Sequence, residues 1–253
     1  RFAPAAGLAP QRETHVDVLV EQRLDARTRL MIEAYDRQDA GLLSRSTLEP
    51  RLVTGAGGTA AALVVDADPD APWLNAQDGY ARGVQVTLQR RSANGFSGWM
   101  SYAYSRAVIT DARLGQSFAS DYDQRHTINA FLSRRLSPTI HISGQFAFGS
   151  GMPLPGFYAR AGSGYQLATQ RNALRAPYYQ RTDLRINKAI TRTRFDATLF
   201  AELINVTNHT NRDFDAAGAY NPLTAETSPT FFSMFPILPS VGLTLTFARG
   251  RGR

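Results

Sequence analysis

The stretch Val84-Gln85-Val86-Thr87-Leu88-Gln89 exchanges apolar and polar residues at every position. A repeat of two residues places the two kinds of side chain on opposite faces of a β-strand. The same alternation recurs in residues 140–146 and 241–247, where polar or small residues separate the apolar ones. The pattern predicts an all-β chain of long amphipathic strands, which we expect near residues 14–23, 27–38, 80–92, 96–109, 125–135, 139–149, 178–190, 194–205 and 238–247.

The links between the expected strands alternate in length. Those after the first, third, fifth and seventh strands are short, and they contain Leu24-Asp25-Ala26, Ser92-Ala93-Asn94-Gly95, Leu136-Ser137-Pro138 and Thr191-Arg192-Thr193. Asn-Gly and Ser-Pro are typical of tight turns. The other links are long and rich in Gly, Pro, Ala and Asp, at about 39–79, 110–124, 150–177 and 206–237. All turns therefore lie at one end and all loops at the other, as in outer-membrane barrels.

Strand length also favours an antiparallel transmembrane β-barrel over a soluble β-sandwich. Strands of about 10–14 residues exceed the usual globular length and suit a tilted membrane crossing. A soluble domain also seldom carries four long loops without structure. No stretch approaches 18 uninterrupted apolar residues, so a membrane-spanning helix is not expected. The mean hydropathy of −0.27 fits alternating strands.

The number of expected strands points to an incomplete barrel. Nine is odd, whereas single-chain bacterial barrels have an even number of strands, and open edges do not persist in hydrocarbon. Residues 1–10 also lack the apolar core of a signal peptide. We therefore expect residues 1–253 to be about nine C-terminal strands of a larger barrel, completed by strands from upstream or from another chain.

Composition argues against several other classes of protein. The chain has no cysteine, which excludes disulfides and thiolate sites. Its formal charge of +7 comes almost wholly from arginine, but the arginines are scattered among acids, so nucleic-acid binding is not expected. The four histidines show no ligand spacing, and no nucleophile elbow or phosphate loop occurs. We predict no cofactor, no metal site and no enzymatic activity.

Several segments resemble, in order, the C-terminal barrel of TonB-dependent receptors, especially the branch with an N-terminal carboxypeptidase-regulatory-like domain. They are residues 83–90, 95–105, 121–129 (Asp-Tyr-Asp-Gln-Arg-His-Thr-Ile-Asn), 148–153, 181–188, 202–208 and the final strand. The resemblance implies a roughly 22-stranded barrel with a separate plug domain. Neither the plug nor the segment that contacts TonB is recognisable in this sequence.

The same resemblance implies a function and a location. Such a receptor would lie in the outer membrane of a Gram-negative bacterium and import a ligand too large for porins, such as a metal chelate, cobalamin or a glycan. Its partners would be outer-membrane lipid, the barrel assembly machinery, the imported ligand, and the TonB system acting through the plug.

The final strand carries a pattern that the assembly machinery recognises in this class. Ser240, Gly242, Leu245 and Phe247 match its polar, glycine, apolar and aromatic positions. We expect Leu243, Leu245 and Phe247 to face lipid, and Thr244 and Thr246 to face the lumen. Six residues follow Phe247, whereas barrels of this class usually end on the aromatic residue.

Ligand contacts are expected from the long loops and from the lumen. The aromatic candidates are Trp73, Tyr80, Phe157, Tyr158, Tyr178 and Tyr179, with Phe231, Phe232 and Phe235 nearby in sequence, although half of these aromatics would also suit a membrane girdle. The polar candidates share one side of their strand and would line the lumen: Arg181, Asp183, Arg185 and Asn187. Pairing within the wall or with the plug is the favoured role of these four, ahead of ligand contact.

Three further expectations concern loop ends. Asp121 and Asp123 are predicted to cap and to pair with Arg125, and His126 to anchor the loop by hydrogen bonds. Asn205 and Asn208 are predicted to shape a strand exit rather than to carry glycans.

Two alternatives stay open on the sequence. The chain could belong to a structural or adhesive outer-membrane barrel that does not transport. It could also be a complete ten-stranded barrel, possibly an enzyme, with its tenth strand hidden in residues 1–13 or 58–66.

Overall fold

The computed structural model describes residues 7–53, 63–192 and 195–247, and nine long antiparallel strands in chain order form its main sheet. They are β1 (Arg12–Arg23), β2 (Thr28–Ser44), β5 (Leu74–Ala93), β6 (Phe96–Asp111), β8 (His126–Arg135), β9 (Ile140–Gly149), β12 (Tyr179–Thr191), β13 (Phe195–Ile204) and β17 (Leu238–Phe247). A short strand, β7 (Gln116–Ala119), adds to β6. All nine predicted strands are confirmed. The described residues form no helix long and apolar enough to cross a membrane.

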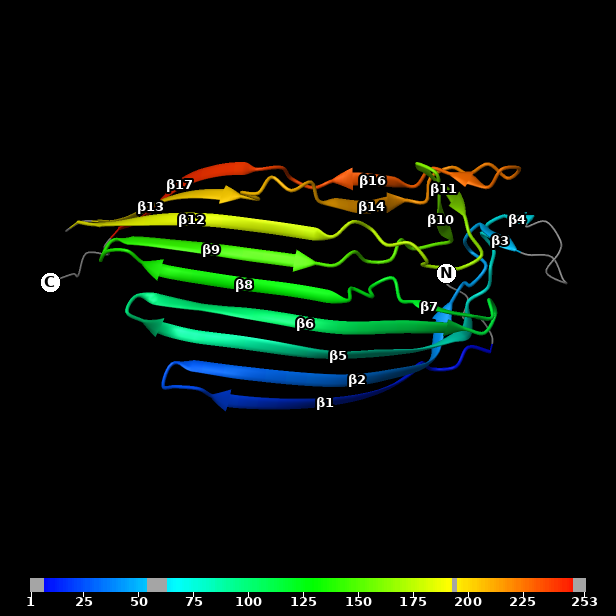
Figure 1. Ribbon diagram of the computed structural model, residues 1–253, viewed down its shortest axis with the longest axis horizontal. Coiled ribbons are helices and arrows are strands. Elements are labelled where there is room, and N and C mark those ends of the chain that lie inside the picture. Colours follow the sequence, from blue (N-terminus) through cyan, green and yellow to red (C-terminus); the bar gives the residue numbers. More distant parts are fainter. Residues whose placement is uncertain (1–6, 54–62, 193–194, 248–253) are drawn as a thin grey trace.

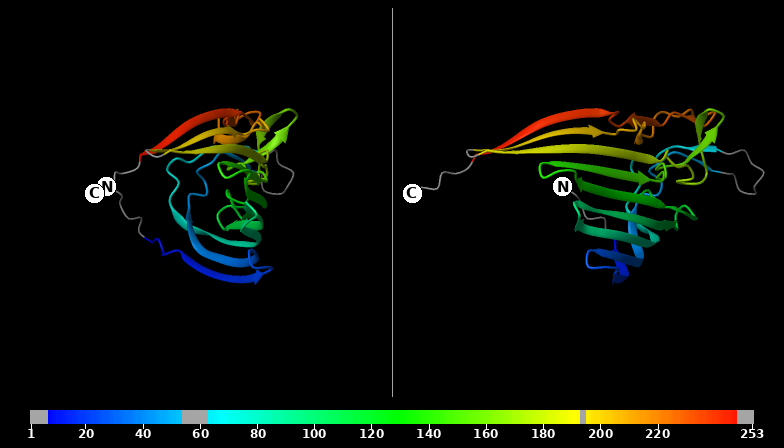
Figure 2. Two further views of the ribbon diagram at one scale, coloured as in Figure 1. Left: turned by 90° about the vertical axis from the view of Figure 1, so that its left-hand side faces the viewer. Right: turned by 60° about the vertical axis from the view of Figure 1, so that its left-hand side comes forward.

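The connections sort to the two ends of the sheet as predicted. Short turns join the strand pairs at one end, and the four long loops gather at the other (Figure 1). The sheet curves into an open arc with β1 and β17 at its edges (Figure 2). Because nine strands alternate in direction, β1 and β17 run the same way, so an antiparallel ladder cannot close between them. Of the two segments considered for a tenth strand, residues 1–6 and 58–62 lie outside the described residues. The described remainder supplies only the start of β1, at Arg12, and β4 (Leu63–Val65), which pairs with β3 (Arg51–Val53) and not with the main sheet.

Continuous register divides the side chains of the sheet between two faces. One face, called here the apolar face, carries apolar side chains that are mostly about half exposed, such as Val18 (59%), Leu199 (50%) and Leu243 (58%). Other members, aligned through the cross-strand pairs, are Val16, Val20, Leu30, Ile32, Val84, Val86, Leu88, Met100, Leu132, Ile142, Ile186 and Leu245. A sheet that exposes such a continuous apolar surface matches a wall that faces lipid rather than water.

The opposite face, called here the polar face, carries mainly hydrophilic and small side chains. It includes Glu33, Gln85, Ser101, Asn129, Gln145, Asp183, Glu202 and Thr244. Aromatic side chains such as Trp99 and Phe131 share this face with them.

Aromatic and basic side chains border the apolar face at both ends. Near the loops the border includes Tyr80, Tyr102, Tyr104, Phe148 and Tyr178, with His126 and His209 stacked against them. Near the turns it includes Phe96, Phe195 and Phe247, with Arg90, Arg134 and Lys188. Tyr178 and Lys188 are about ten residues apart, which at ~3.4 Å per residue and ~40° tilt gives roughly 25 Å, the height of the lipid-facing band of outer-membrane barrels.

Two strands extend farther toward the loops than the sequence indicates. The ladder between β2 and β5 continues to the pair of Ser44 with Leu74, beyond the predicted strand ends near 38 and 80. Two register shifts follow Asp39, and Gly41 adopts a positive φ of 66°. Bulges of this kind break the two-residue alternation. The predicted end near 38 was therefore too early and the predicted start near 80 too late, and the first long link shortens to residues 45–73.

The long loops are structured, contrary to the expectation of four loops without structure. They contain β3, β4, β7, β10 (Tyr158–Ala161), β11 (Gly164–Leu167), β14 (Arg212–Ala216), β15 (Glu226–Thr227) and β16 (Thr230–Ser233). Among the described residues, the buried apolar side chains also lie there, except for Ala197: Ala71, Phe118, Leu154, Phe157, Tyr158, Leu167 and Ala225. The only compact apolar core described is therefore in the loops.

Gly242 of the closing strand has a steric role. It pairs with Phe200 of β13, and a Cβ atom at position 242 would lie 2.3 Å from the Phe200 ring. The Arg185 guanidinium lies 4.0 Å from the centroid of the same ring. The ring thus packs between arginine and glycine, which fastens β17 to β13 and, through Arg185, to β12.

Gly242→Ala is expected to weaken the attachment of the closing strand, because the ring would have to move off its position. We expect a loss of roughly 1–3 kcal/mol, the usual cost of overpacking, measured by urea unfolding of the protein in lipid vesicles. Gly144→Ala is the control, because its nearest contact would be 3.2 Å from a flexible Leu184 methyl group. Equal stability of the two variants would contradict the packing role of Gly242.

Candidate functional site

The four long loops are joined to one another and form one layer, called here the loop layer. The Leu52 amide donates to the Ala168 carbonyl at 2.9 Å, which joins the first loop to the third. The third and fourth loops share a small sheet through β11 and β15. The Tyr220 hydroxyl donates to Asp66 at 2.7 Å, and this hydrogen bond joins the fourth loop to the first. The layer is therefore held by contacts between segments far apart in sequence.

Arg171 is a central connection of the loop layer. Its Nε and Nη2 atoms donate to both oxygens of Glu49 at 2.9 and 3.0 Å, and Nη1 donates to Asp121 at 2.7 Å. The guanidinium also packs on Phe118, 5.1 Å from the ring centroid. Its side chain is only 16% exposed, and a bidentate pair of this kind is both strong and directional. One side chain thus joins the first three loops.

Asp123 is a second connection, and its carboxylate is buried. It accepts from the Ala107 amide at 2.7 Å, from Arg125 Nε at 2.6 Å, and from Arg175. Burial opposes the ionisation of Asp123, but the hydrogen bonds from Ala107, Arg125 and Arg175 outweigh burial and lower its pKa. The predicted pairing of Asp123 with Arg125 is confirmed, whereas Asp121 pairs with Arg171 instead.

Three adjoining hollows lie beneath and between the loops. The first, about 390 Å³, is lined by Trp73, Leu114 and Arg171, and the second, also about 390 Å³, by Met152 and Phe214. Asp121 and Tyr122 line both the first and the second hollow. Two of the strand residues that line the first hollow, Gln77 and Ile109, belong to the polar face. Hollows of this size hold small organic ligands.

The third hollow, about 560 Å³, is more apolar. Phe232, Phe235 and Ile204 line it, and the side chain of Arg181 supplies a charge at its edge. Tyr179 and Met234 line both the second and the third hollow. Shared walls therefore connect all three hollows in a row, called here the loop trough.

The structure distributes the six aromatic candidates among three environments. Trp73 and Tyr179 line the loop trough. Tyr80 and Tyr178 lie on the border of the apolar face, where Tyr178 stacks on His209 with ring centroids 4.8 Å apart. Ligand contact therefore stays a prediction for Trp73 and Tyr179, and the position of Tyr80 and Tyr178 suits the girdle alternative.

Phe157 and Tyr158 belong to the packed core of the loop layer. Their exposed fractions are 1% and 4%. Burial, together with the charge of Glu49, raises the pKa of Tyr158 to about 12. These two side chains stabilise the loops and present no surface to a ligand, which the sequence could not reveal because both stand in a Gly-rich and Pro-rich segment.

The four polar candidates of β12 share the polar face and make contacts within the wall. Arg181 binds Asp183 through Nε and Nη2 at 2.6–2.9 Å. Arg185 donates to Asn187 at 3.0 Å and lies 3.7 Å from Glu202. These side chains therefore pair within the wall, which is the role that the sequence favoured. Of the four, only Arg181 also lines the loop trough.

Asparagine side chains close the strand exit after β13. Asn205 is buried at a positive φ of 53°, and its Nδ2 donates to the carbonyls of His209 and Phe235 at 3.0 and 3.1 Å. Asn208 accepts from the Ile237 amide at 2.9 Å. Asn211 exchanges two hydrogen bonds with the backbone of Gln180. The predicted shaping role of Asn205 and Asn208 is confirmed.

His126 also behaves as an anchoring residue. Its amide donates to Ser150 Oγ at 3.0 Å, and its Nδ1 atom lies 2.9 Å from the Tyr102 hydroxyl. Over the described ranges, no three acidic, histidine or cysteine side chains gather as a metal site.

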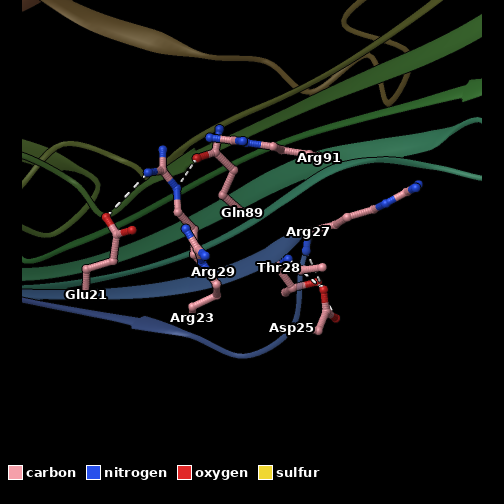
Figure 3. Close-up of a pocket in the computed structure, with 9 residues that line it drawn as sticks. Glu21, Arg23, Asp25, Arg27, Thr28, Arg29, Gln89 and Arg91 are labelled. Atoms are coloured by element: carbon pink, nitrogen blue, oxygen red, sulfur yellow. Dashed lines mark hydrogen bonds and ion pairs between the residues drawn. The ribbon is translucent and has the colours of Figure 1, made fainter.

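A group of arginines lies on the polar face at the turn end (Figure 3). Arg29 binds Gln89 at 2.7 Å and Glu21 at 3.4 Å. Arg23 is the direct cross-strand partner of Arg29. The hollow between these side chains measures only about 40 Å³, with room for water rather than an organic ligand. The loop trough is therefore the better candidate for a binding site.

The closing-strand residues lie as the sequence indicates. Ser240 and Gly242 belong to the polar face, and Leu245 and Phe247 belong to the apolar face, where Phe247 is 71% exposed. Their recognition by an assembly machinery stays a prediction.

The sequence did not identify Arg171, Tyr122 or Met234 as site residues. Arg171 stands in Ala-Thr-Gln-Arg-Asn-Ala without periodicity or a motif, and its partners are distant in sequence. Only the folded loops bring them together.

The loop layer is expected to loosen in acid because of Asp123. A carboxylate whose pKa is lowered on folding stabilises above its unfolded pKa of ~3.9, and that stabilisation is lost as the pH falls through the folded value. Protease cleavage within residues 112–125 and 150–178 should therefore rise below about pH 4. Asp123→Asn should cause similar cleavage at neutral pH and cost about 2 kcal/mol of local stability. The control is Asp70→Asn, at an exposed loop position; equal cleavage of both variants would contradict this role.

Comparison with known proteins gives structural matches only. No family model and no curated protein matches the chain by sequence. The FrpB iron transporter from Neisseria meningitidis aligns at 12% identity and a TM-score of 0.57, over 94% of this chain and 31% of that one. FpvA from P. aeruginosa, bound to heterologous pyoverdines, aligns at 12% and 0.56, over 94% and 27%. The ferric-catecholate import receptor Fiu from K12 E. coli aligns at 12% and 0.52, over 94% and 27%.

The chain thus spans a third or less of the length of these transporters and receptors. A sequence identity of 12% supports a similarity of fold alone. The described residues have the all-β, antiparallel fold of part of an outer-membrane transporter barrel.

Proposed function

We propose that this chain forms the C-terminal part of the barrel wall, and much of the ligand-binding loop layer, of a TonB-dependent importer in the outer membrane of a Gram-negative bacterium. The loop trough carries this proposal. It opens among cross-linked loops at one end of a sheet whose other face is apolar, so a ligand held there would stand above the lumen and not in lipid.

The ligand that fits the loop trough best combines flat apolar parts with anionic or polar groups. The side chains of Trp73, Tyr179 and Phe235 offer aromatic faces for stacking. Arg212 supplies a positive charge along the trough, where Arg171 and Arg181 are already paired with carboxylates. A metal chelate with aromatic ligating groups has this chemistry. The names of the structural neighbours, a ferric-catecholate receptor and a receptor bound to pyoverdines, agree with this class. Cobalamin and glycans are the next candidates.

The further partners follow from the same proposal. Outer-membrane lipid would cover the apolar face, and a plug outside residues 1–253 would couple the barrel to the TonB system. Membership of the branch with a carboxypeptidase-regulatory-like domain, and a barrel of roughly 22 strands, are parts of this proposal that the full-length sequence would test.

Tyr179→Ala is expected to impair ligand uptake, because Tyr179 forms the wall between two hollows of the trough. Uptake is measured with iron-55 supplied as ferric catecholate or pyoverdine chelates, and with labelled cobalamin, in cells that carry the full-length protein. For the accepted ligand, uptake should fall roughly tenfold, as for loss of one stacking contact of ~1.4 kcal/mol.

The neighbouring tyrosine is a matched control. Tyr178→Ala changes the same side chain one residue away, on the apolar face, and should leave uptake near the wild-type value. Deletion of TonB should abolish the uptake that the wild-type protein supports. Uptake of none of these ligands, or uptake that persists without TonB, would contradict import and favour the structural barrel.

Phe247→Ala is expected to weaken recognition by the barrel assembly machinery, since it removes the aromatic residue of the closing pattern. The readout is the amount of protein inserted in the outer membrane, together with cross-linking of the closing strand to the machinery. Phe195→Ala, which removes the cross-strand partner of Phe247 but leaves the pattern intact, serves as the control. Wild-type cross-linking by Phe247→Ala would contradict the signal.

A further inference from the structure

Two arginines oppose each other at the loop-side border of the apolar face. Arg82 of β5 and Arg106 of β6 are direct cross-strand partners. Asp36 of β2 stands opposite Arg82 on its other side and forms an ion pair with it. The side chain of Arg106 has no hydrogen bond or ion pair with any other described residue. The three side chains therefore leave one uncompensated positive charge.

This arrangement costs stability unless an anion is shared. Like charges directly opposite on neighbouring strands repel, since their Cβ atoms are only ~5 Å apart. The Tyr80 ring supports Arg82, with the guanidinium 4.7 Å from its centroid. A hollow of about 400 Å³ lies between these side chains, and Val84 and Tyr104 also line it, as does Asp36, whose carboxylate is paired with Arg82. Two guanidinium groups beside one hollow match the oxygen atoms of a phosphate.

The position of this hollow indicates the rest of the ligand. Val84 and Tyr104 pair directly below the two arginines, and the apolar face continues below them with Val86, Leu88 and Met100. A molecule whose phosphate binds the arginines would lay any acyl chains on this surface. A lipid has this shape, whereas a free phosphate would use none of the apolar contacts.

Among the described residues, the turn-side border of the apolar face carries no comparable pair of arginines. Arg90 there binds Thr28 at 2.9 Å and lies 3.5 Å from Asp25. Arg134 stands opposite Phe96 and Ile142, not opposite a second cation. Arg23 and Arg29 are also cross-strand partners at the turn end, but they lie on the polar face, where Arg29 binds Glu21 and Gln89. On the described apolar face the paired arrangement is thus particular to the loop side, which in the proposed orientation is the outer leaflet.

We propose that Arg82 and Arg106, together with Tyr80 and Tyr104, form a binding site for the phosphate group of an anionic lipid at the outer surface of the barrel. The inference rests on the proposed function only in taking the apolar face as the lipid-facing wall. It assigns these residues to the surrounding membrane and separates them from the loop trough on the other face.

The test uses the full-length protein extracted in detergent from native membranes, with native mass spectrometry to count bound lipid. The probes are dioleoyl phosphatidic acid, dioleoylglycerol of equal acyl content, and inorganic phosphate as a competitor. Arg106→Gln and Arg82→Gln should each weaken phosphatidic acid binding roughly five- to tenfold. Arg106→Lys should retain most of it, and dioleoylglycerol should bind all forms equally. Heat-dependent gel mobility confirms that each variant is folded.

Arg134→Gln is the matched control, with the same charge change on the same face at the opposite border. Unchanged phosphatidic acid binding in Arg106→Gln, or an equal loss in Arg134→Gln, would overturn the site. Displacement of the lipid by inorganic phosphate at equal concentration would reduce it to a free-phosphate site and overturn the lipid assignment.

Cell fractionation and uptake separate this inference from the proposed function. If the protein lies in the outer membrane and supports normal uptake, but neither arginine affects lipid binding, only the lipid site is contradicted. If the protein is absent from the outer membrane, the proposed function is contradicted, and so is the assignment of the apolar face to lipid.

Discussion

The antiparallel ladder of backbone hydrogen bonds is the constraint on which the rest of the structure depends. Each strand keeps one register with its neighbour over most of its length, so every side chain in the sheet is committed to one of two faces. A slip of one residue would exchange the apolar and polar faces. The ladder also satisfies the backbone polar groups of the inner strands, which would allow these strands to expose Val86 or Ile142 to a medium without water.

The packed core lies outside the main sheet. Globular proteins bury apolar side chains between layers, whereas the described strands expose theirs and the loops bury Phe157, Leu154 and Leu167. The loops also hold the buried Asp123 and Arg171, whose side chain is only 16% exposed. Arg171 and Asp123 each join segments that would otherwise be independent. The loop layer is therefore preorganised, and the loop trough exists because separate loops share walls there.

The apolar face and the polar face of the sheet present different side chains to the surroundings. Neighbouring residues can face opposite sides of the wall, as Tyr178 on the apolar border and Tyr179 in the trough illustrate. Charge follows the same division. On the polar face Arg181 and Arg185 find partners within the wall, whereas Arg106 at the apolar border has none among the described residues. An unpaired cation beside an apolar surface indicates a partner from the surroundings, and a lipid phosphate supplies one.

The sequence by itself determined the strands, their faces and the ends to which turns and loops belong, because a period of two and turn chemistry are local properties of the chain. It also located the polar face of β12 and the strand exit at Asn205. Only the tertiary structure decided which loop aromatics are buried, which border the apolar face and which line the trough, because burial depends on contacts between distant segments. Arg171 with Glu49 and Asp121, and Arg82 opposite Arg106, depend in the same way on loop packing and strand register. Local patterns identify strands, but long-range register and packing create the sites.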